Sequence, residues 1–296
     1  MFSVLIPTWN NLDYLKLCLE GLRKHSVFDH EILVHINEGS DGTLNWIRDQ
    51  GVRYTSSQNN IGVCLAVNRL AGLANNDWIV YLNDDMVCCP GWDEAVLSVI
   101  SKADNDLAFY SSRLIEPTNT GNKDVLVGDC GQSPDNFDWD KLLRTYSDDA
   151  SSELLDGASQ PTIVSRKWWH MVGGYSVEFS PGMASDIDLL MKFWVAGCRT
   201  FRIVDSSRVY HFACRSTGRI KKNRGGRQFV MKWGLTEAEF KKNYLSKCSA
   251  FGLTPDTFPE ASPLGRLKRM IYGLGCNFPL EDLKSWSPFN DSSPSK

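Results

Sequence analysis

The stretch Ser3-Val4-Leu5-Ile6-Pro7-Thr8-Trp9-Asn10 begins as an apolar run and ends in polar residues. A short apolar run bounded by turn-forming residues is typical of a buried β-strand. The same pattern returns at Glu31–Ile36, Val52–Thr55 and Trp78–Leu82. We therefore expect four strands at regular intervals in the first part of the chain.

Helical patterns lie between these expected strands. Apolar residues recur there every three or four positions, at Leu12, Leu15, Leu19, Leu22, Leu65, Leu70, Leu73 and Ala74. Alternation of strands and helices predicts an α/β fold with a mostly parallel central sheet flanked by helices. Ligands of such sheets bind beyond the carboxyl ends of the strands. The polar segments Pro7–Asn10, Asn37–Gly42 and Asn83–Asp85, each directly after a strand, are therefore predicted to form a site.

Composition narrows the class of protein. The chain has 296 residues, 42% hydrophobic and 23% charged, as in an ordinary soluble globular protein. The net charge of -3 and the pI near 6.0 give no overall attraction to nucleic acid or to anionic membranes. No stretch approaches the roughly 20 consecutive apolar residues of a membrane span, and the first residues lack the pattern of a signal peptide.

The nine cysteines are odd in number and scattered, and no pair has the CxxC spacing. A disulfide framework or a zinc site is therefore not expected. We expect a cytoplasmic protein, because free thiols persist in a reducing compartment.

The second half is less regular. Glu116–Asp140 is rich in Asn, Asp, Gly and Pro and predicts a long loop, whereas Thr162–Val164, Asp186–Ala196 and Thr200–Val204 predict a strand, a helix and a strand. Between Ser206 and Thr236 there is no acidic residue but there are eight basic ones. This local excess of positive charge indicates an anionic ligand, with a solvated basic face as the alternative.

Asn83-Asp84-Asp85 directly follows the strand Trp78–Leu82. Carboxylate oxygens at a strand end suit a hard divalent cation such as Mg²⁺ or Mn²⁺. The alternative is a simple turn, because Asn and Asp are common turn formers. The tripeptide alone leaves both interpretations open.

The order of the post-strand segments strongly resembles the donor-binding half of family 2 glycosyltransferases, which are inverting enzymes of GT-A fold that use nucleotide-diphosphate sugars. The resemblance implies that the metal is bound by Asp85, which matches the ligand of the family's Asp-x-Asp motif, and that Glu38 contacts the base or ribose. It further implies a set of donor-binding residues: Pro7, Thr8, Trp9, Asn10, Asn60, Gly62, Asn83 and Asp84.

A second match follows in the later half. Gly173-Gly174-Tyr175 and Ser185-Asp186-Ile187-Asp188-Leu189 resemble the family's Gly-Gly-Phe/Tyr and Glu-Asp-x-Asp-Leu segments. The resemblance makes Asp186 the catalytic base that accepts the proton of the acceptor hydroxyl, with a helix N-cap as the alternative role. Asp188 is expected to hold the acceptor or the structure.

His211 is implied as a second metal ligand, since the family often places a histidine here and imidazole suits Mn²⁺. The basic loop Arg215–Arg227 is expected to cover the pyrophosphate, with donor contacts from Arg215, Arg219 and Arg224. Trp168 and Trp169 are candidates for stacking on the acceptor sugar, with core packing as the alternative.

The expected organisation is a GT-A domain over 1–235, with a nucleotide-binding half over about 1–103 and an acceptor half over about 104–235. A helical C-terminal extension at 236–285 and a disordered tail at 286–296 complete it. Thr236–Leu245 is predicted to be helical, because it opens with Thr-Glu-Ala-Glu, the sequence of a capping box. Leu264–Leu274 is basic and amphipathic and could dock on the main domain or lie peripherally on a membrane surface.

The sequence therefore predicts an inverting glycosyltransferase that uses a divalent metal, Mn²⁺ rather than Mg²⁺. It would move a sugar from a nucleotide-diphosphate donor to a hydroxyl of a glycan, lipid-linked or other acceptor, without nucleic acid. Asn37, Asn83 and Ser185 depart from the family pattern. They keep open a non-catalytic module that binds nucleotide-sugars or carbohydrates.

Overall fold

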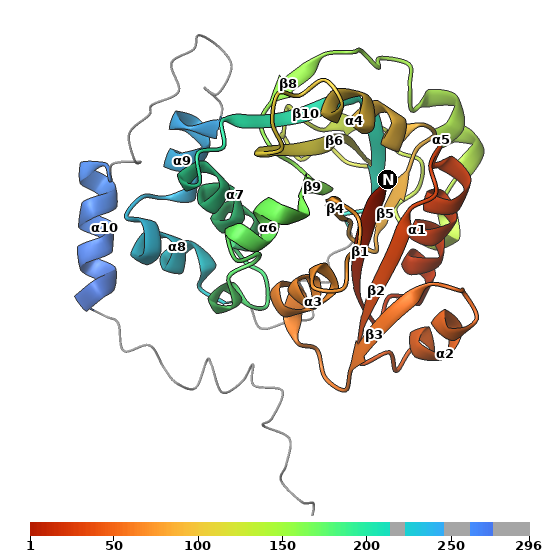
Figure 1. Cartoon of the computed structure of the whole chain (residues 1–296), viewed down its shortest axis with the longest axis horizontal. Coiled ribbons are helices and arrows are strands. Elements are labelled where there is room, and N and C mark those ends of the chain that lie inside the picture. Colours follow the sequence, from red (N-terminus) through yellow and green to blue (C-terminus); the bar gives the residue numbers. More distant parts are fainter. Residues whose placement is uncertain (214–222, 246–260, 275–296) are drawn as a thin grey trace, which may run out of the picture.

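The computed structural model describes residues 1–213, 223–245 and 261–274, whose helices and strands are shown in Figure 1. The first part alternates strands with helices in the order β1 (Phe2–Trp9), α1 (Leu12–His25), β2 (Glu31–Asn37), α2 (Thr43–Arg48), β3 (Arg53–Ser57), α3 (Gly62–Ala71), β4 (Trp78–Tyr81), β5 (Met86–Cys88) and α4 (Trp92–Ile100). All four strands expected in this part are present. The short helix α2 was not expected.

The second part contains β6 (Ala108–Glu116), β7 (Leu126–Val127), η1 (Pro134–Asn136), α5 (Trp139–Thr145), β8 (Leu154–Asp156), β9 (Thr162–Ser165), α6 (Arg166–Met171), η2 (Val177–Phe179), α7 (Ser185–Val195), β10 (Thr200–His211), α8 (Gly225–Trp233), α9 (Glu237–Asn243) and α10 (Pro263–Leu274). Glu116–Asp140 is mostly irregular, as predicted, although it contains the short β7 and η1.

The strands described by the structure form one ten-stranded sheet, with β3-β2-β1-β4-β9-β6-β10-β5 as its main order and β7 and β8 at its margins. β1 is parallel to β2 and β4, β2 to β3, and β6 to β10. β9 is antiparallel to β4 and β6, and β5 is antiparallel to β10. The α/β fold with a mostly parallel sheet is confirmed, with β5, β8 and β9 antiparallel to their neighbours.

Helices cover both faces of this sheet, and alternation along β1 explains why. Leu5 belongs to the cluster that contains Val67 and Leu70 of α3, whereas Val4 and Ile6 belong to the cluster around α1. Neighbouring side chains of a strand point to opposite faces. A strand buried on both faces therefore reads as a continuous apolar run.

The strand expected at Thr200–Val204 continues to His211 as β10, with a register shift between Val204 and Arg208. Asp205 lies in this irregular stretch and accepts hydrogen bonds from Arg113 and Arg208. The polar residues interrupt the apolar pattern without ending the strand, because the buried carboxylate is paired.

The helix predicted within Thr236–Leu245 is present as α9, whereas a C-terminal extension beginning at residue 236 stays a prediction. Thr236 and Glu239 form the expected capping box at the start of α9, and Phe240 lies in the same core cluster as Leu5. The tail predicted at 286–296 lies outside the described residues, and the division into halves at 103 stays a prediction. Within the described ranges, no helix combines the length and the apolar character that crossing a bilayer requires.

Candidate active site

A cleft of about 410 Å³ opens where β1, β2 and β4 end, facing the start of α7. Most of the residues predicted from the sequence to bind the donor or metal, or to act as base, line it: Pro7, Thr8, Trp9, Asn60, Gly62, Asn83, Asp84, Asp85, Asp186 and His211. A smaller hollow beside β3 is lined by Leu33, Tyr54 and other largely apolar residues. None of the candidate residues lines this smaller hollow.

Strand pairing brings the candidate metal ligands together. Asp85 directly precedes β5, and His211, the last residue of β10, pairs with Met86 in the antiparallel register. The Nε2 atom of His211 lies 3.6 Å from Oδ1 of Asp85. Asp84 and Asn83 complete the turn between β4 and β5. These positions are far apart in sequence and become neighbours only through the sheet.

Glu116, which the sequence reading had treated only as the start of a loop, contacts the other side of this imidazole. It ends β6 beside β10, and its Oε1 lies 2.8 Å from Nδ1 of His211. Burial lowers the pKa of His211, but the hydrogen bond to Glu116 and the charges of Asp85 and Glu116 outweigh it, so the pKa is raised. The signal that the sequence offered for Glu116 was its place at the polar end of an apolar strand.

Asp85 and His211 are the candidate ligands for a divalent cation. No group of three or more His, Cys, Asp or Glu side chains in the described ranges is arranged to hold a metal by itself. Asp85 and His211 supply two ligands of the type that Mn²⁺ accepts. The pair fits a metal whose other positions are filled by oxygens of a bound ligand.

Asp186 lies in the first turn of α7 and faces the cleft, where its side chain is exposed. Oδ1 accepts hydrogen bonds from the Tyr175 hydroxyl at 2.6 Å and from Nε2 of Gln160 at 3.3 Å. In the described part of the chain, Oδ2 accepts none. Asp186 therefore offers one oriented carboxylate oxygen to a molecule in the cleft.

The pKa of Asp186 is raised above its ordinary value. Crowding by surrounding protein is the main cause, because it reduces the hydration of the carboxylate although the cleft leaves part of its surface open to water. The hydrogen bonds from Tyr175 and Gln160 oppose this shift. A raised pKa makes this carboxylate a stronger base than an aspartate with the ordinary pKa.

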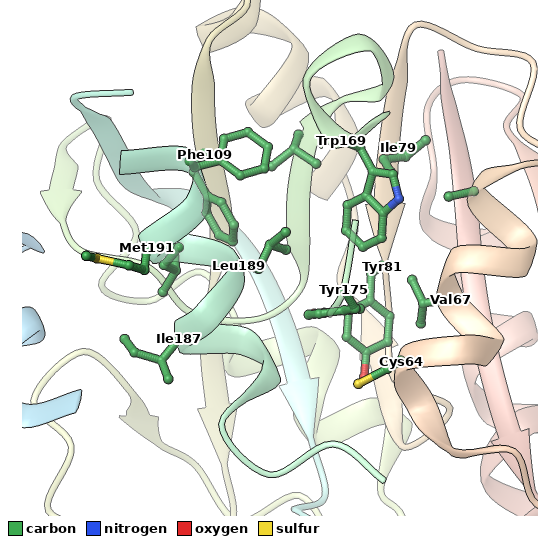
Figure 2. Packing of buried hydrophobic residues seen from close by; sticks show 14 of the residues in the cluster. Cys64, Val67, Ile79, Tyr81, Phe109, Trp169, Tyr175, Ile187, Leu189 and Met191 are labelled. Carbon is green, nitrogen blue, oxygen red and sulfur yellow. The ribbon is translucent and has the colours of Figure 1, made fainter. Parts of the chain in front are cut away.

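Tyr175 is held rigidly behind Asp186. Its backbone N–H and C=O both bond to the side chain of Asn68 on α3, and its ring meets Tyr81 and Trp169 edge to face. Figure 2 shows Tyr175 inside the core between α3 and α7, beside Tyr81 and Trp169. Tyr175 was predicted only as part of the motif Gly173-Gly174-Tyr175, which gave no sign that its hydroxyl contacts Asp186.

One wall of the cleft is built around Asn37, the last residue of β2 and the first residue of the polar segment Asn37–Gly42. Its Oδ1 accepts from the backbone N–H of Ile61 at 2.9 Å, and its Nδ2 donates to the carbonyl of Thr8. This ties the turn before α3 to the end of β1. The hydroxyl of Thr8 is buried at the cleft wall and has no hydrogen-bond partner among the described residues, so a ligand could supply one.

Glu38 and Asn10 were predicted to bind the donor, but neither lines the cleft. They bond to each other beside it, with 3.0 Å between Nδ2 of Asn10 and Oε2 of Glu38. Both have positive φ, as do Ala184 and Ala213. These are all the described non-glycine residues with positive φ, and each adjoins the cleft. Such strain persists where the surroundings enforce it and is typical of functional sites.

Trp168, Trp169 and Asp188 do not line the cleft, and their contacts match the structural alternative that the sequence left open for them. Trp169 is 2% exposed and Asp188 is fully buried. Asp188 accepts from Ser176 and Trp233. Two residues along a helix face different directions, so Asp188 points into the core while Asp186 faces the cleft. Trp168 instead donates its indole N–H to Asp106, away from the cleft.

The basic loop is only partly described. Arg215 and Arg219 lie outside the described residues, and Arg224 is exposed at the start of α8 without lining the cleft. Asn223 donates to the carbonyls of Phe179 and Ser180. At Gly225, a Cβ would lie 2.1 Å from the carbonyl oxygen of Met183, so only glycine permits this approach. The end of the basic segment is thus attached to the loop that precedes Asp186.

One family of known proteins matches about half of the chain. Residues 3–154 match the family described as Glycosyl transferase family 2. No curated protein matches the chain.

Three solved structures share the fold. S. aureus TarS 1–349 with UDP-GlcNAc has a TM-score of 0.56 at 13% identity, over 96% of this chain and 78% of that one. GalNAc-T7 with UDP, GalNAc and Mn²⁺ gives 0.58 at 15%, over 92% and 54%. The mannosyltransferase PcManGT from Pyrobaculum calidifontis with GDP-Man and Mn²⁺ gives 0.52 at 14%, over 93% and 74%. The match to TarS with UDP spans 59% of that chain.

Proposed function

The chain belongs to glycosyl transferase family 2, and on that premise we propose that it is an inverting hexosyl- or related transferase that uses a nucleotide-diphosphate sugar. The observation that carries the proposal is one cleft with a candidate base, Asp186, and a candidate metal pair, Asp85 and His211. The ligands named for TarS, GalNAc-T7 and PcManGT include UDP, UDP-GlcNAc and GDP-Man, which supports this class of donor.

In the proposed reaction, the acceptor hydroxyl attacks the anomeric carbon while Oδ2 of Asp186 takes its proton. The bond between that carbon and the diphosphate oxygen breaks, and the nucleoside diphosphate leaves with the electron pair. A single displacement inverts the anomeric configuration. Tyr175 and Gln160 orient the carboxylate through Oδ1, which leaves Oδ2 toward the acceptor.

The diphosphate end of the donor is assigned to the opposite side of the cleft. Asp85 and His211 would hold a divalent cation there, and the chemistry that it supplies is neutralisation of charge on the leaving group. Glu116 would hold the imidazole so that Nε2 faces Asp85. The nucleotide's base and ribose are assigned to the part of the cleft lined by Thr8 and Asn60. There the buried Thr8 hydroxyl has no hydrogen-bond partner among the described residues.

We assign the acceptor to a glycan or a lipid-linked sugar in polysaccharide biosynthesis, and the protein to the cytoplasm. The described cysteines are all buried free thiols, which suits a reducing compartment. Arg215 and Arg219 remain proposed diphosphate contacts from the sequence.

The direct experiment incubates the protein with Mn²⁺ and a panel of UDP- and GDP-sugars, and measures release of nucleoside diphosphate. Slow hydrolysis of one donor, lost in Asp85→Ala and kept in the exposed control Asp104→Asn, is the expected result. Tight donor binding without turnover under any acceptor would instead support the non-catalytic binding module.

Metal binding is tested separately by calorimetry, with Mn²⁺ titrated in the presence and absence of nucleoside diphosphate. Two protein ligands leave most of the coordination to diphosphate oxygens, so binding should be much tighter when the nucleotide is present. Equal affinity in both titrations, or binding undiminished in Asp85→Ala, would contradict this assignment.

A further inference from the structure

We propose that α10 binds the surface of a membrane that contains anionic phospholipids. Its large apolar side chains are exposed, with fractions between 48% and 85%: Leu264, Leu267, Met270, Ile271 and Leu274. At 3.6 residues per turn these five fall on one side of the helix. An exposed stripe of this kind normally marks a binding surface.

The opposite side of α10 is already packed, which fixes the direction in which the stripe faces. Gly265 is buried, and a Cβ there would lie 2.8 Å from the carbonyl oxygen of Gly234. Arg227 of α8 donates to the carbonyl of Tyr272 at 2.8 Å and lies over its ring. Figure 1 shows α10 at the edge of the molecule, beyond α8. The helix therefore docks by a narrow face and presents its apolar side outward.

The charges of α10 indicate the chemistry of the partner. Its charged residues are Arg266, Lys268 and Arg269, and Pro263–Leu274 contains no acidic residue. On a helical projection, Arg266 and Lys268 stand on the two borders of the apolar stripe. Basic side chains at these borders can reach lipid phosphates while the stripe enters the acyl boundary. An anionic membrane surface complements both the apolar stripe and the charge.

The length of the helix determines its orientation on the membrane. Twelve residues span about 18 Å, less than the roughly 30 Å of a hydrocarbon core. The helix would therefore lie in the plane of the interface. The cleft and α10 belong to one chain, so such binding would hold the active site near acceptors carried by lipid.

The test is sedimentation of the full chain with vesicles of phosphatidylcholine alone or mixed with phosphatidylglycerol. We expect binding to the anionic vesicles that weakens as salt is added. The double variant Leu267→Asn, Ile271→Asn should lower the partition coefficient about tenfold or more. The matched control is Leu143→Asn on α5, where the side chain is similarly exposed, and it should bind as the parent protein does.

A second variant, Arg266→Gln with Lys268→Gln, keeps the apolar stripe and should reduce binding to anionic vesicles only. Failure of the parent protein to bind, equal binding by Leu267→Asn, Ile271→Asn, or equal binding to both vesicle types would overturn the proposal. Self-association that disappears in the same double variant would assign the stripe to a second copy instead. Because no donor is present, the outcome is independent of the proposed transfer reaction.

Discussion

The side of the cleft that we assign to the donor and the side that we assign to the acceptor differ in how well the sequence predicted them. On the donor side, Thr8 and Asp85 lie where the strand-end argument placed them, although Asn10 and Glu38 do not line the cleft. On the acceptor side only Asp186 does, while Trp169 and Asp188 are in the core. Parallel strands bring their carboxyl ends to one edge, whereas the face of a helix that meets a cleft depends on what packs around it.

The largest effect is expected from Asp186, the predicted acceptor-side residue that lines the cleft. Asp186→Asn keeps the size and hydrogen-bonding capacity of the side chain but cannot accept the proton. We expect the transfer rate to fall about a thousandfold, with donor affinity unchanged by calorimetry. Normal transfer by this variant would show that another group is the base.

A buried histidine in β2, the strand that carries Asn37, makes the free energy of unfolding depend on pH. His35 is fully buried, and burial, helped by the charge of Arg69, lowers its pKa from 6.5 to about 4. Folding therefore favours the neutral form of His35. Its contribution to the free energy of unfolding is fully present above pH 6.5 and is lost as the pH falls from 6.5 to about 4. The loss should reach about 3 kcal/mol.

Denaturant unfolding at a series of pH values measures this effect. His35→Gln cannot be protonated, so its free energy of unfolding should vary less over that interval than in the parent protein. The exposed-site control Tyr54→Phe should keep the parental pH dependence. An unchanged slope in His35→Gln would contradict the assignment.

The next prediction concerns Glu116, whose contact with His211 on the donor side was not predicted from the sequence. Glu116→Ala removes the partner of Nδ1 in His211, so the imidazole loses its fixed tautomer. The affinity for Mn²⁺ with nucleoside diphosphate should fall about tenfold to a hundredfold, while Glu116→Gln should restore part of it.

Calorimetry distinguishes the two ways in which the Glu116 prediction can fail. No Mn²⁺ binding by the parent protein contradicts the metal site itself. Binding by the parent and by Glu116→Ala at equal strength contradicts only the role of Glu116.

The smallest effect is expected from Tyr175, whose hydroxyl donates to the proposed base, Asp186. Tyr175→Phe keeps the ring packing but removes the hydroxyl that donates to Asp186. Since that hydrogen bond lowers the pKa of Asp186, its loss should move the acid limb of the kcat/KM profile to higher pH and reduce kcat about tenfold. A lower rate with an unmoved profile would indicate a purely structural role.

The missed residues share one property. Glu116 ends a strand and Tyr175 sits in a recognised motif, but their partners, His211 and Asp186, are distant or face them only after folding. Periodicity identifies elements and their ends, and it contains no information about which strand lies beside β10. Glu116 could have been suspected as a polar strand end, as Asp85 was.

The sequence by itself determined the α/β alternation, the strand ends that line the cleft, and the identity of Asp85, Asp186 and His211 as candidates. The alternation and the strand ends follow from local patterns, because a buried strand needs apolar residues and its end does not. Asp186 and His211 were singled out by the family resemblance. Only the tertiary structure decided that β9 and β5 run antiparallel, that Asp188 is buried while Asp186 is not, and that Glu116 meets His211. Those facts depend on packing between distant segments, which no window of sequence contains.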